Sequence, residues 1–361
     1  MTARRDYDAI IVGASFAGLA VARRVRGDVL LVDRHEVGAV QTSACGTPLW
    51  VPRWLGVESS VLQVHDRLDL RTPGRTISYD LRAIPFCTFD YGAFARGLLA
   101  QSTATFLKTA VLGLEDGAVR TTAGRFTAPV IVDASGWRGV LVNGRGPALP
   151  ERGGYSFGLE APTPLGDDKL TFVVDRRVVS RGLGWVFPVG RGSLIGLGSY
   201  AGASRLGPAL RLFLADLGAA PAGYHGTFFP SRLGRPTVGR LFAVGDAAGQ
   251  CLPLTAEGIR PALYFGDRCG ELIRRVLAGE LALDSALADY RRLVLRHRQA
   301  YRVLLYAQWL AAHAPSRWFG TIAAAFGRWP LLAYWWPRYG TFGRLAHATG
   351  GGSAVIARTG A

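Results

Sequence analysis

The first 33 residues of the chain restrict its fold more than any other segment. A continuous apolar run at residues 9–12 predicts a parallel β-strand that is buried on both faces. Gly13-Ala14-Ser15-Phe16-Ala17-Gly18 comes next, followed by a helical pattern to Val25 and a second apolar run that ends at Asp33. This order is typical of the βαβ unit that binds dinucleotides, with Ser15 in place of the second glycine.

Each position of this unit has a physical role in holding a phosphate group. Gly13 permits the tight turn, and Gly18 lets the helix approach the strand closely. Backbone N–H groups at the helix start then face a pyrophosphate. Asp33 lies 20 residues after Gly13, where a carboxylate accepts hydrogen bonds from ribose hydroxyls. We therefore predict a nucleotide site in which the Ser15 side chain points away from the phosphates.

Two later strands end in glycine and polar residues. Residues 129–133 form a predicted strand that runs into Ala134-Ser135-Gly136-Trp137-Arg138, and residues 240–244 form another that runs into Gly245-Asp246-Ala247-Ala248-Gly249. A helix is predicted from about residue 260 to residue 277. Taken alone, Gly245-Asp246 is equally typical of a simple turn with Asp246 as a helix cap.

In this order the segments resemble the FAD-dependent flavoprotein superfamily with the p-hydroxybenzoate hydroxylase fold, and most of all its geranylgeranyl reductase branch. Residues 185–188, Trp-Val-Phe-Pro, and then Gly196-Leu197-Gly198 are similar to a signature of that branch, although Leu183 replaces its usual tyrosine. Cys45-Gly46 stands where these reductases carry a Cys-Gly beside the flavin. The matched segments span most of residues 7–277.

The resemblance implies FAD as the cofactor, with NADPH or another reductant as the electron donor. Asp246 would bind the ribitol chain, and the helix start at Gly258 and Ile259 would stabilise negative charge on the flavin pyrimidine edge. Tyr91 replaces an arginine that contacts the cofactor in relatives, so no such contact is predicted there. The residues expected to contact FAD are Gly13, Ser15, Phe16, Ala17, Gly18, Asp33, Arg34, Gly136, Gly245, Asp246, Gly249, Pro253, Gly258 and Ile259.

The implied activity is reduction of C=C double bonds in a polyprenyl lipid by hydride transfer from flavin N5. Cys45 is the candidate proton donor, against the alternative that it is a small buried hydrophobic residue. Trp185, Phe187 and Pro188 are expected to line the substrate pocket, to pack in a sheet, or both. The six histidines and four cysteines show no metal-ligand spacing, so no metal site is predicted.

Other activities stay open. A flavin hydroxylase that uses NAD(P)H and O2 on an aromatic or polyketide substrate would share nearly every motif. A redox-neutral lipid cyclase and a non-enzymatic, nucleotide-bound membrane module are further alternatives. A halogenase is disfavoured because halogenases of this fold need an active-site lysine, and neither Lys108 nor Lys169 lies in a suitable motif.

The expected fold class is α/β with an α+β second layer. A Rossmann-like FAD-binding domain with a parallel sheet would be discontinuous, built from residues 1–50, 88–150 and 235–290. A substrate domain with an antiparallel sheet would comprise residues 51–87 and 151–234. Residues 291–361 would form basic, tryptophan-rich C-terminal helices, broken at Pro315, Pro330 and Pro337.

The formal charge of +16 calls for an anionic partner, and its distribution favours a membrane surface over nucleic acid. Residues 291–361 contain ten arginines and no acidic residue, together with Trp309, Trp318, Trp329, Trp335 and Trp336. Such a mixture fits the headgroup zone of a bilayer. With no apolar run of about 18 residues, and with cysteines typical of reduced thiols, we expect a cytoplasmic protein that associates peripherally with a membrane.

Overall fold

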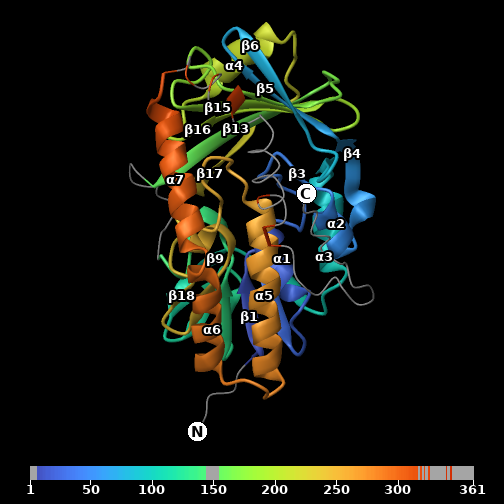
Figure 1. The fold of residues 1–361 in the computed structure, drawn as a ribbon. Coiled ribbons are helices and arrows are strands. Elements are labelled where there is room, and N and C mark those ends of the chain that lie inside the picture. Colours follow the sequence, from blue (N-terminus) through green and yellow to red (C-terminus); the bar gives the residue numbers. More distant parts are fainter. Residues whose placement is uncertain are drawn as a thin grey trace, which may run out of the picture.

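The computed structural model describes residues 6–143 and 154–315, together with residues 318, 321, 324, 325, 339, 342 and 343. Two large β-sheets organise this part of the chain, one of six strands and one of seven. In Figure 1 the six-stranded sheet and its helices occupy the lower half of the molecule, and the seven-stranded sheet occupies the upper half. The fold is α/β with an α+β second layer, which confirms the predicted fold class.

The six-stranded sheet has the order β18-β19-β12-β1-β2-β8, and its pairs are parallel except β18 with β19. Alternate residues of β1 enter two different cores: Ile11 packs on the helical side and Ile10 on the opposite side. The continuous apolar runs follow from this two-sided burial. The strands are β1 (Ala9–Val12), β2 (Val29–Asp33), β8 (Thr105–Lys108), β12 (Val130–Asp133), β18 (Thr237–Val238) and β19 (Leu241–Ala243).

Two three-stranded antiparallel sheets accompany the large ones. The first connects β8 to β12, and its Val119 packs on the parallel sheet opposite the helices. It contains β9 (Val111–Glu115), β10 (Ala118–Thr121) and β11 (Gly124–Thr127). The second has the order β3-β7-β4 and lies near α2 (Trp50–Leu55), η1 (Glu58–Ser60) and α3 (Tyr91–Leu99). Its strands are β3 (Gly46–Pro48), β4 (Val61–His65) and β7 (Phe86–Phe89).

The seven-stranded sheet has the order β17-β13-β16-β15-β14-β5-β6. One face packs on helix α4 (Gly207–Asp216), through residues such as Ile195 and Leu197 against Leu210 and Phe213. The alternate residues are therefore free to line the opposite face. The strands are β5 (Arg67–Thr72), β6 (Arg75–Asp80), β13 (Tyr155–Thr163), β14 (Leu170–Val173), β15 (Gly182–Pro188), β16 (Ser193–Ser199) and β17 (His225–Pro230).

Two helices that are far apart in the sequence, α1 (Phe16–Ala22) and α5 (Ile259–Leu277), pack closely against each other. Gly266 and Gly270, one turn apart on α5, make this possible. A Cβ atom at Gly266 would lie 2.7 Å from the carbonyl oxygen of Ala17, and one at Gly270 would lie 2.6 Å from that of Val21. Glycine at both positions lets α5 pack closely on α1, which begins in the glycine-rich turn after β1.

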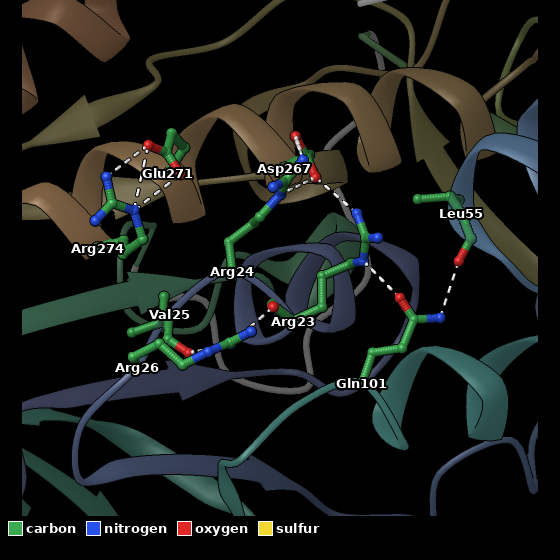
Figure 2. Close-up of polar contacts among 9 residues, drawn as sticks. All are labelled: Arg23, Arg24, Val25, Arg26, Leu55, Gln101, Asp267, Glu271 and Arg274. Carbon is green, nitrogen blue, oxygen red and sulfur yellow. Dashed lines mark hydrogen bonds and ion pairs between the residues drawn. The ribbon is translucent and has the colours of Figure 1, made fainter. Parts of the chain in front are cut away.

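A buried carboxylate on α5 also binds the two arginines that follow α1 (Figure 2). Asp267 on α5 is 2 % exposed and accepts hydrogen bonds from Arg23 Nη1 at 2.8 Å and from Arg24 Nε at 2.6 Å. Gln101, after α3, accepts a hydrogen bond from Arg23 Nε at 3.1 Å and donates one to the carbonyl oxygen of Leu55 at 2.9 Å. These contacts join the ends of α1, α2 and α3 to α5.

The last helices are α6 (Leu283–Leu295) and α7 (Arg298–His313), and α7 runs beside both halves of the molecule (Figure 1). Its inner side contacts a loop that follows β19. Leu254 N donates to Gln308 Oε1 at 2.9 Å, and Tyr301 Oη donates to the carbonyl oxygen of Gln250 at 2.6 Å. The helix ends at His313, and Ala314 is extended before Pro315, as the sequence predicts.

Two details differ from the sequence-based expectations. The second-layer sheet is not wholly antiparallel, because β14 pairs in parallel with β5, which adds β5 and β6 at its edge. Residues 296 and 297 also interrupt the C-terminal helices, with no proline there.

Trp329, Trp335 and Trp336 lie outside the described residues. The division of the chain into three parts stays a prediction. Over the described residues, helices are too short or too polar to cross a bilayer.

Candidate functional site

A cavity of about 720 Å3 lies where the carboxyl ends of the parallel strands meet the inner face of the seven-stranded sheet. Its wall comes from segments that are distant in the sequence. Gly13 and Asp33 follow β1 and β2, Asp246 follows β19, and Trp185 belongs to β15. The carboxyl edge of an open parallel sheet is where α/β proteins bind ligands, because loops and helix starts converge there.

The glycine-rich turn after β1 forms one end of the wall. Gly13 has φ +103°, and a Cβ atom there would lie 2.2 Å from the carbonyl oxygen of Ala134, so only glycine fits. Gly18 is equally restricted, since its Cβ atom would lie 1.8 Å from the carbonyl oxygen of Gly13. The Ser15 hydroxyl lies 3.1 Å from the Tyr91 hydroxyl. Two of the residues that depart from the flavoprotein pattern thus contact each other.

Asp33 connects this turn to the end of β2. Its Oδ2 accepts a hydrogen bond from Ala14 N at 2.8 Å, and its Oδ1 accepts one from His35 N at 2.9 Å. The carboxylate is therefore held at the cavity wall by backbone N–H groups on both sides. This fixed position suits a group that accepts hydrogen bonds from hydroxyls of a ligand.

Two arginines, Arg34 and Arg138, bring positive charge to the same cavity. Burial lowers the pKa of Arg138, and the charge of Arg34 lowers it further. Among the described residues, Arg138 Nε is buried without a hydrogen-bond partner. Two nearby cations with an unsatisfied donor favour an anionic ligand at this end of the cavity.

The segment after β19 supplies a carboxylate at the middle of the wall. Burial raises the pKa of the Asp246 carboxyl to about 7. The structure gives this side chain no hydrogen bond or ion pair with any described residue. Gln250 shapes the turn itself: its Oε1 accepts a hydrogen bond from Gly245 N at 2.7 Å, and its Nε2 donates to Tyr290 Oη at 3.0 Å. The carboxylate is thus preorganised for a ligand with hydroxyl groups.

The loop between this turn and α5 is held in an unusual backbone conformation. Leu254 and Ala256 have φ +68° and +54°, which L-residues rarely adopt. Tyr200 Oη donates a hydrogen bond to the carbonyl oxygen of Leu254 at 2.5 Å, and Gln308 holds the N–H of the same residue. Such strain is stored where the surrounding structure fixes a functional loop. The loop leads to Gly258, at the start of α5, on the cavity wall.

The seven-stranded sheet closes the cavity with aromatic rings. Trp185 is paired in register with Gly196, and a Cβ atom at Gly196 would lie 2.2 Å from Cζ2 of the indole. The ring also lies over Gly198 and Gly158, whose Cβ atoms would be 3.4 and 3.6 Å from it. The Trp-x-Phe-Pro and Gly-x-Gly segments therefore form one packing unit, because the glycines make room for the indole. Phe187 packs edge-on against Phe172, with ring centroids 5.4 Å apart.

Cys45 lies behind the wall and is 1 % exposed. Its thiol donates to the carbonyl oxygen of Ser43 at 3.3 Å, and its neighbours Ala44 and Gly46 line the cavity. Burial raises the pKa of this thiol, and the charges of Glu160 and Asp90 raise it further. Its φ of +55° turns the chain at this point. Cys251, by contrast, lies on the wall.

Most of the residues predicted from the sequence meet at this cavity, and five do not line it. Gly18 and Gly249 pack against backbone oxygens, Pro188 alternates with Phe187 and faces away, and Pro253 and Cys45 are buried beside the wall. Those that line the cavity are Gly13, Ser15, Phe16, Ala17, Asp33, Arg34, Gly136, Trp185, Phe187, Gly245, Asp246, Gly258 and Ile259.

Sequence analysis missed several wall residues, notably Glu160, His225 and Arg138. Glu160 had a usable signal, because it is the one acidic residue of β13 and occupies an inward position there. His225 had none, since its place depends on the pairing of β17 with β13. No cluster of three or more potential metal ligands occurs within the part of the chain that the structure describes.

No protein-family model matches the sequence, and no curated protein does so either. Solved structures do match. A geranylgeranyl bacteriochlorophyll reductase-like protein from Thermoplasma acidophilum is 18% identical, with a TM-score of 0.78 over 87% of this chain and 90% of its own. PqsL from Pseudomonas aeruginosa, in complex with 2-aminobenzoylacetate, is 18% identical, with a TM-score of 0.70 over 88% and 99%. This chain has the FAD-dependent flavoprotein fold.

The myxobacterial chondrochloren halogenase CndH, an FAD-dependent halogenase, shares the same flavoprotein fold, at 17% identity and a TM-score of 0.67 over 92% of each chain. The flavoprotein fold thus extends over both large sheets and is compatible with several chemistries. Lys108 lies on β8, 3.4 Å from Glu36, and neither it nor Lys169 lines the cavity. The two lysines of the sequence are therefore not placed to contact a bound substrate.

Proposed function

We propose that the protein is an FAD-dependent oxidoreductase that reduces C=C double bonds of a polyprenyl lipid. One observation carries the proposal: a single cavity joins the carboxyl edge of the parallel sheet, with its glycine-rich turn, to an apolar wall on the second sheet. A dinucleotide and an apolar substrate would thereby meet inside the protein, away from water. NADPH or another reductant would supply the electrons.

The residues present fit FAD. Asp33, held by two backbone N–H groups, would accept hydrogen bonds from the ribose, and the unpaired carboxylate of Asp246 would accept them from the ribitol chain. Gly136, with φ +75° and no protein atom within 4 Å of its Cβ position, leaves backbone open to the ligand. When bound, the flavin would supply hydride transfer at N5.

The substrate class follows from the wall of the second sheet. Trp185, Phe187 and Phe172 present rings to the cavity, and Leu170 and Leu183 extend this apolar surface. A hydrocarbon chain suits such a surface, because burying it removes apolar area from water. The similarity to a protein named as geranylgeranyl bacteriochlorophyll reductase-like supports the same class.

Cys45 stays our proposed proton donor. The thiol is protonated at neutral pH, as a proton donor must be, and burial raises its pKa, which holds the proton in place but weakens the acid. The Ser43–Gly46 segment would have to move slightly to bring the thiol to the cavity, since only its neighbours line the wall. Comparing Cys45→Ser with Cys87→Ser, a cysteine buried on β7, tests this role. Loss of prenyl reduction in the first variant alone is the expected result.

The decisive experiment starts with the absorption spectrum of the purified full-length chain. A flavin band near about 450 nm is expected, with bleaching by dithionite. Anaerobic addition of a geranylgeranyl lipid should restore the band and yield a product with one C=C bond reduced for each flavin reoxidised, because reduced flavin supplies two electrons. A colourless protein that cannot be reconstituted with FAD would refute the proposal, and would leave a non-enzymatic module. Product formation without net electron transfer would indicate a cyclase instead.

A hydroxylase is the second candidate, and the match to PqsL favours it. That match extends over 99% of PqsL, whose own name is that of a probable FAD-dependent monooxygenase. The discriminating measurement is NADPH consumption in air with aromatic substrates. A hydroxylated product would support this candidate, whereas oxidation of reduced flavin by a prenyl lipid without O2 would support the reductase.

We also propose that the protein docks on an anionic membrane through the outer face of α7. Val303, Tyr306, Trp309 and Leu310 are exposed there, by 43% to 63% of their surface. Tyr306 and Trp309 stack with ring centroids 6.0 Å apart. Arginines on this helix would contact lipid phosphates while the rings enter the headgroup zone.

A further inference from the structure

Glu160, on β13, is a buried carboxylate in the wall of the cavity. It is 3 % exposed. Its Oε2 accepts a hydrogen bond from Trp185 Nε1 at 2.6 Å, and its Oε1 lies 2.9 Å from His225 Nε2. A carboxylate taken out of water is stable only with partners for its oxygens, so these two contacts hold it in the sheet.

The contact with His225 leaves hydrogen-bonding capacity unused. Within the described residues, Glu160 Oε1 and His225 Nε2 are both buried and neither has a hydrogen bond of proper geometry, although they are close enough for an ion pair. A carboxylate acceptor and an imidazole nitrogen, which donates or accepts according to its protonation, are thus left unsatisfied side by side. Buried polar atoms without partners are rare in proteins and mark a place for a ligand or a water molecule.

The register of the sheet puts this pair at one end of an apolar row. His225 is opposite Glu160, Glu160 is opposite Gly196, Gly196 is opposite Trp185, and Trp185 is opposite Phe172. The side chains of this row face the cavity. A ligand along the row would place its hydrocarbon part on the two aromatic rings and its polar end at the pair.

We propose that Glu160 and His225 bind a hydroxyl group of the substrate, so that the lipid is a prenyl alcohol or a prenylated phenol. A hydroxyl both donates and accepts, and it would therefore satisfy Oε1 of Glu160 and Nε2 of His225 together. An ether accepts only, and a hydrocarbon does neither. Trp185 fixes the other oxygen of Glu160 and keeps the carboxylate turned toward the histidine. The inference rests on the proposed function, whose substrate class it narrows.

The test compares three ligands of nearly equal shape: farnesol, farnesyl methyl ether, and the hydrocarbon that lacks the oxygen. Calorimetry with the oxidised full-length protein measures their affinities without turnover. We expect farnesol to bind about tenfold more tightly than the ether, because leaving a buried donor or acceptor unpaired is costly. Glu160→Gln and His225→Phe should each reduce this preference to within about twofold, with affinity for the hydrocarbon nearly unchanged.

Thr227→Val is the matched control. Thr227 lines the same wall from β17, but its hydroxyl already donates to the carbonyl oxygen of Phe228 at 3.1 Å. The preference for farnesol should persist in this variant. Equal affinity of the wild type for all three ligands, or an unchanged preference in a folded His225→Phe protein, would overturn the inference. Absence of a flavin spectrum would count against the proposed function alone, since the ligand comparison needs no turnover.

Discussion

Replacement of Gly196 by alanine should destabilise the second sheet mainly through a clash with the Trp185 indole, and to a lesser degree through the carbonyl oxygen of Leu159, 2.8 Å from the new Cβ atom. The new Cβ atom would lie 2.2 Å from Cζ2 and 2.5 Å from Cε2 of Trp185. The indole cannot yield freely, because its N–H donates to Glu160 at 2.6 Å and its far edge lies over Gly158. The variant must therefore either compress the ring or break its hydrogen bond.

The magnitude follows from these two contributions. Overpacking of a well-packed site costs about 1–3 kcal/mol. Leaving the buried Glu160 oxygen without its indole donor costs about 1–3 kcal/mol more. We therefore expect Gly196→Ala to lower the free energy of unfolding by about 2–6 kcal/mol, a large share of the 5–15 kcal/mol typical of a folded protein.

Urea unfolding followed by circular dichroism measures this loss. Gly166→Ala is the control, because no atom lies within 4 Å of a Cβ there and its φ is not in the left-handed region. It should change the free energy of unfolding by less than about 0.5 kcal/mol. In a Trp185→Leu background the cost of Gly196→Ala should fall by more than about 1 kcal/mol. An undiminished cost in that background would refute the assignment of the clash to the indole.

Three further predictions concern charge and exposure. Asp267→Asn should lower the free energy of unfolding by about 2–4 kcal/mol, because two arginines lose a buried partner; urea titration should show a much smaller loss for Asp289→Asn, whose ion pair is exposed. Because the folded-state pKa of Asp246 is raised to about 7, the cofactor-free protein should lose stability as pH rises from about 4 through 7. Asp246→Asn should remove that loss of stability. Thermal unfolding measured across this pH range checks the prediction, and a variant whose pH dependence equals that of the wild type would contradict it. The double variant Tyr306→Ser, Trp309→Ser should cosediment less with anionic vesicles than the wild type does. Equal binding of the two proteins would exclude docking through α7.

Much of the fold could be predicted from local sequence signals. The run before Gly13 predicts a strand buried on two faces, and the spacing from Gly13 to Asp33 predicts the turn, helix and second strand that the structure contains. The helix predicted from about residue 260 begins at Ile259. These signals are strong because they reside in contiguous residues, where periodicity and glycine conformation dictate the backbone.

The site could be predicted only in part. Asp33 and Asp246 were recognisable because Asp33 ends one strand and Asp246 comes soon after another, so both must lie at the sheet edge. The sequence did not show that Cys45 and Pro188 lie off the wall, since burial of a side chain depends on strand alternation and on neighbours elsewhere in the chain. The coupling of Ser15 to Tyr91 was equally invisible, although both residues were noted as departures from the family pattern.

Local sequence signals specify the carboxyl edge of the parallel sheet, because its turns and strands are set by adjacent residues. What faces that edge depends on long-range pairing. Glu160, Trp185 and His225 come from three strands of one sheet, and their contact depends on register across β17, β13, β16 and β15. A shift of one residue in any pairing would turn such a side chain to the opposite face. Register is fixed by packing of the whole sheet on α4 and over the cavity, and no local pattern encodes it.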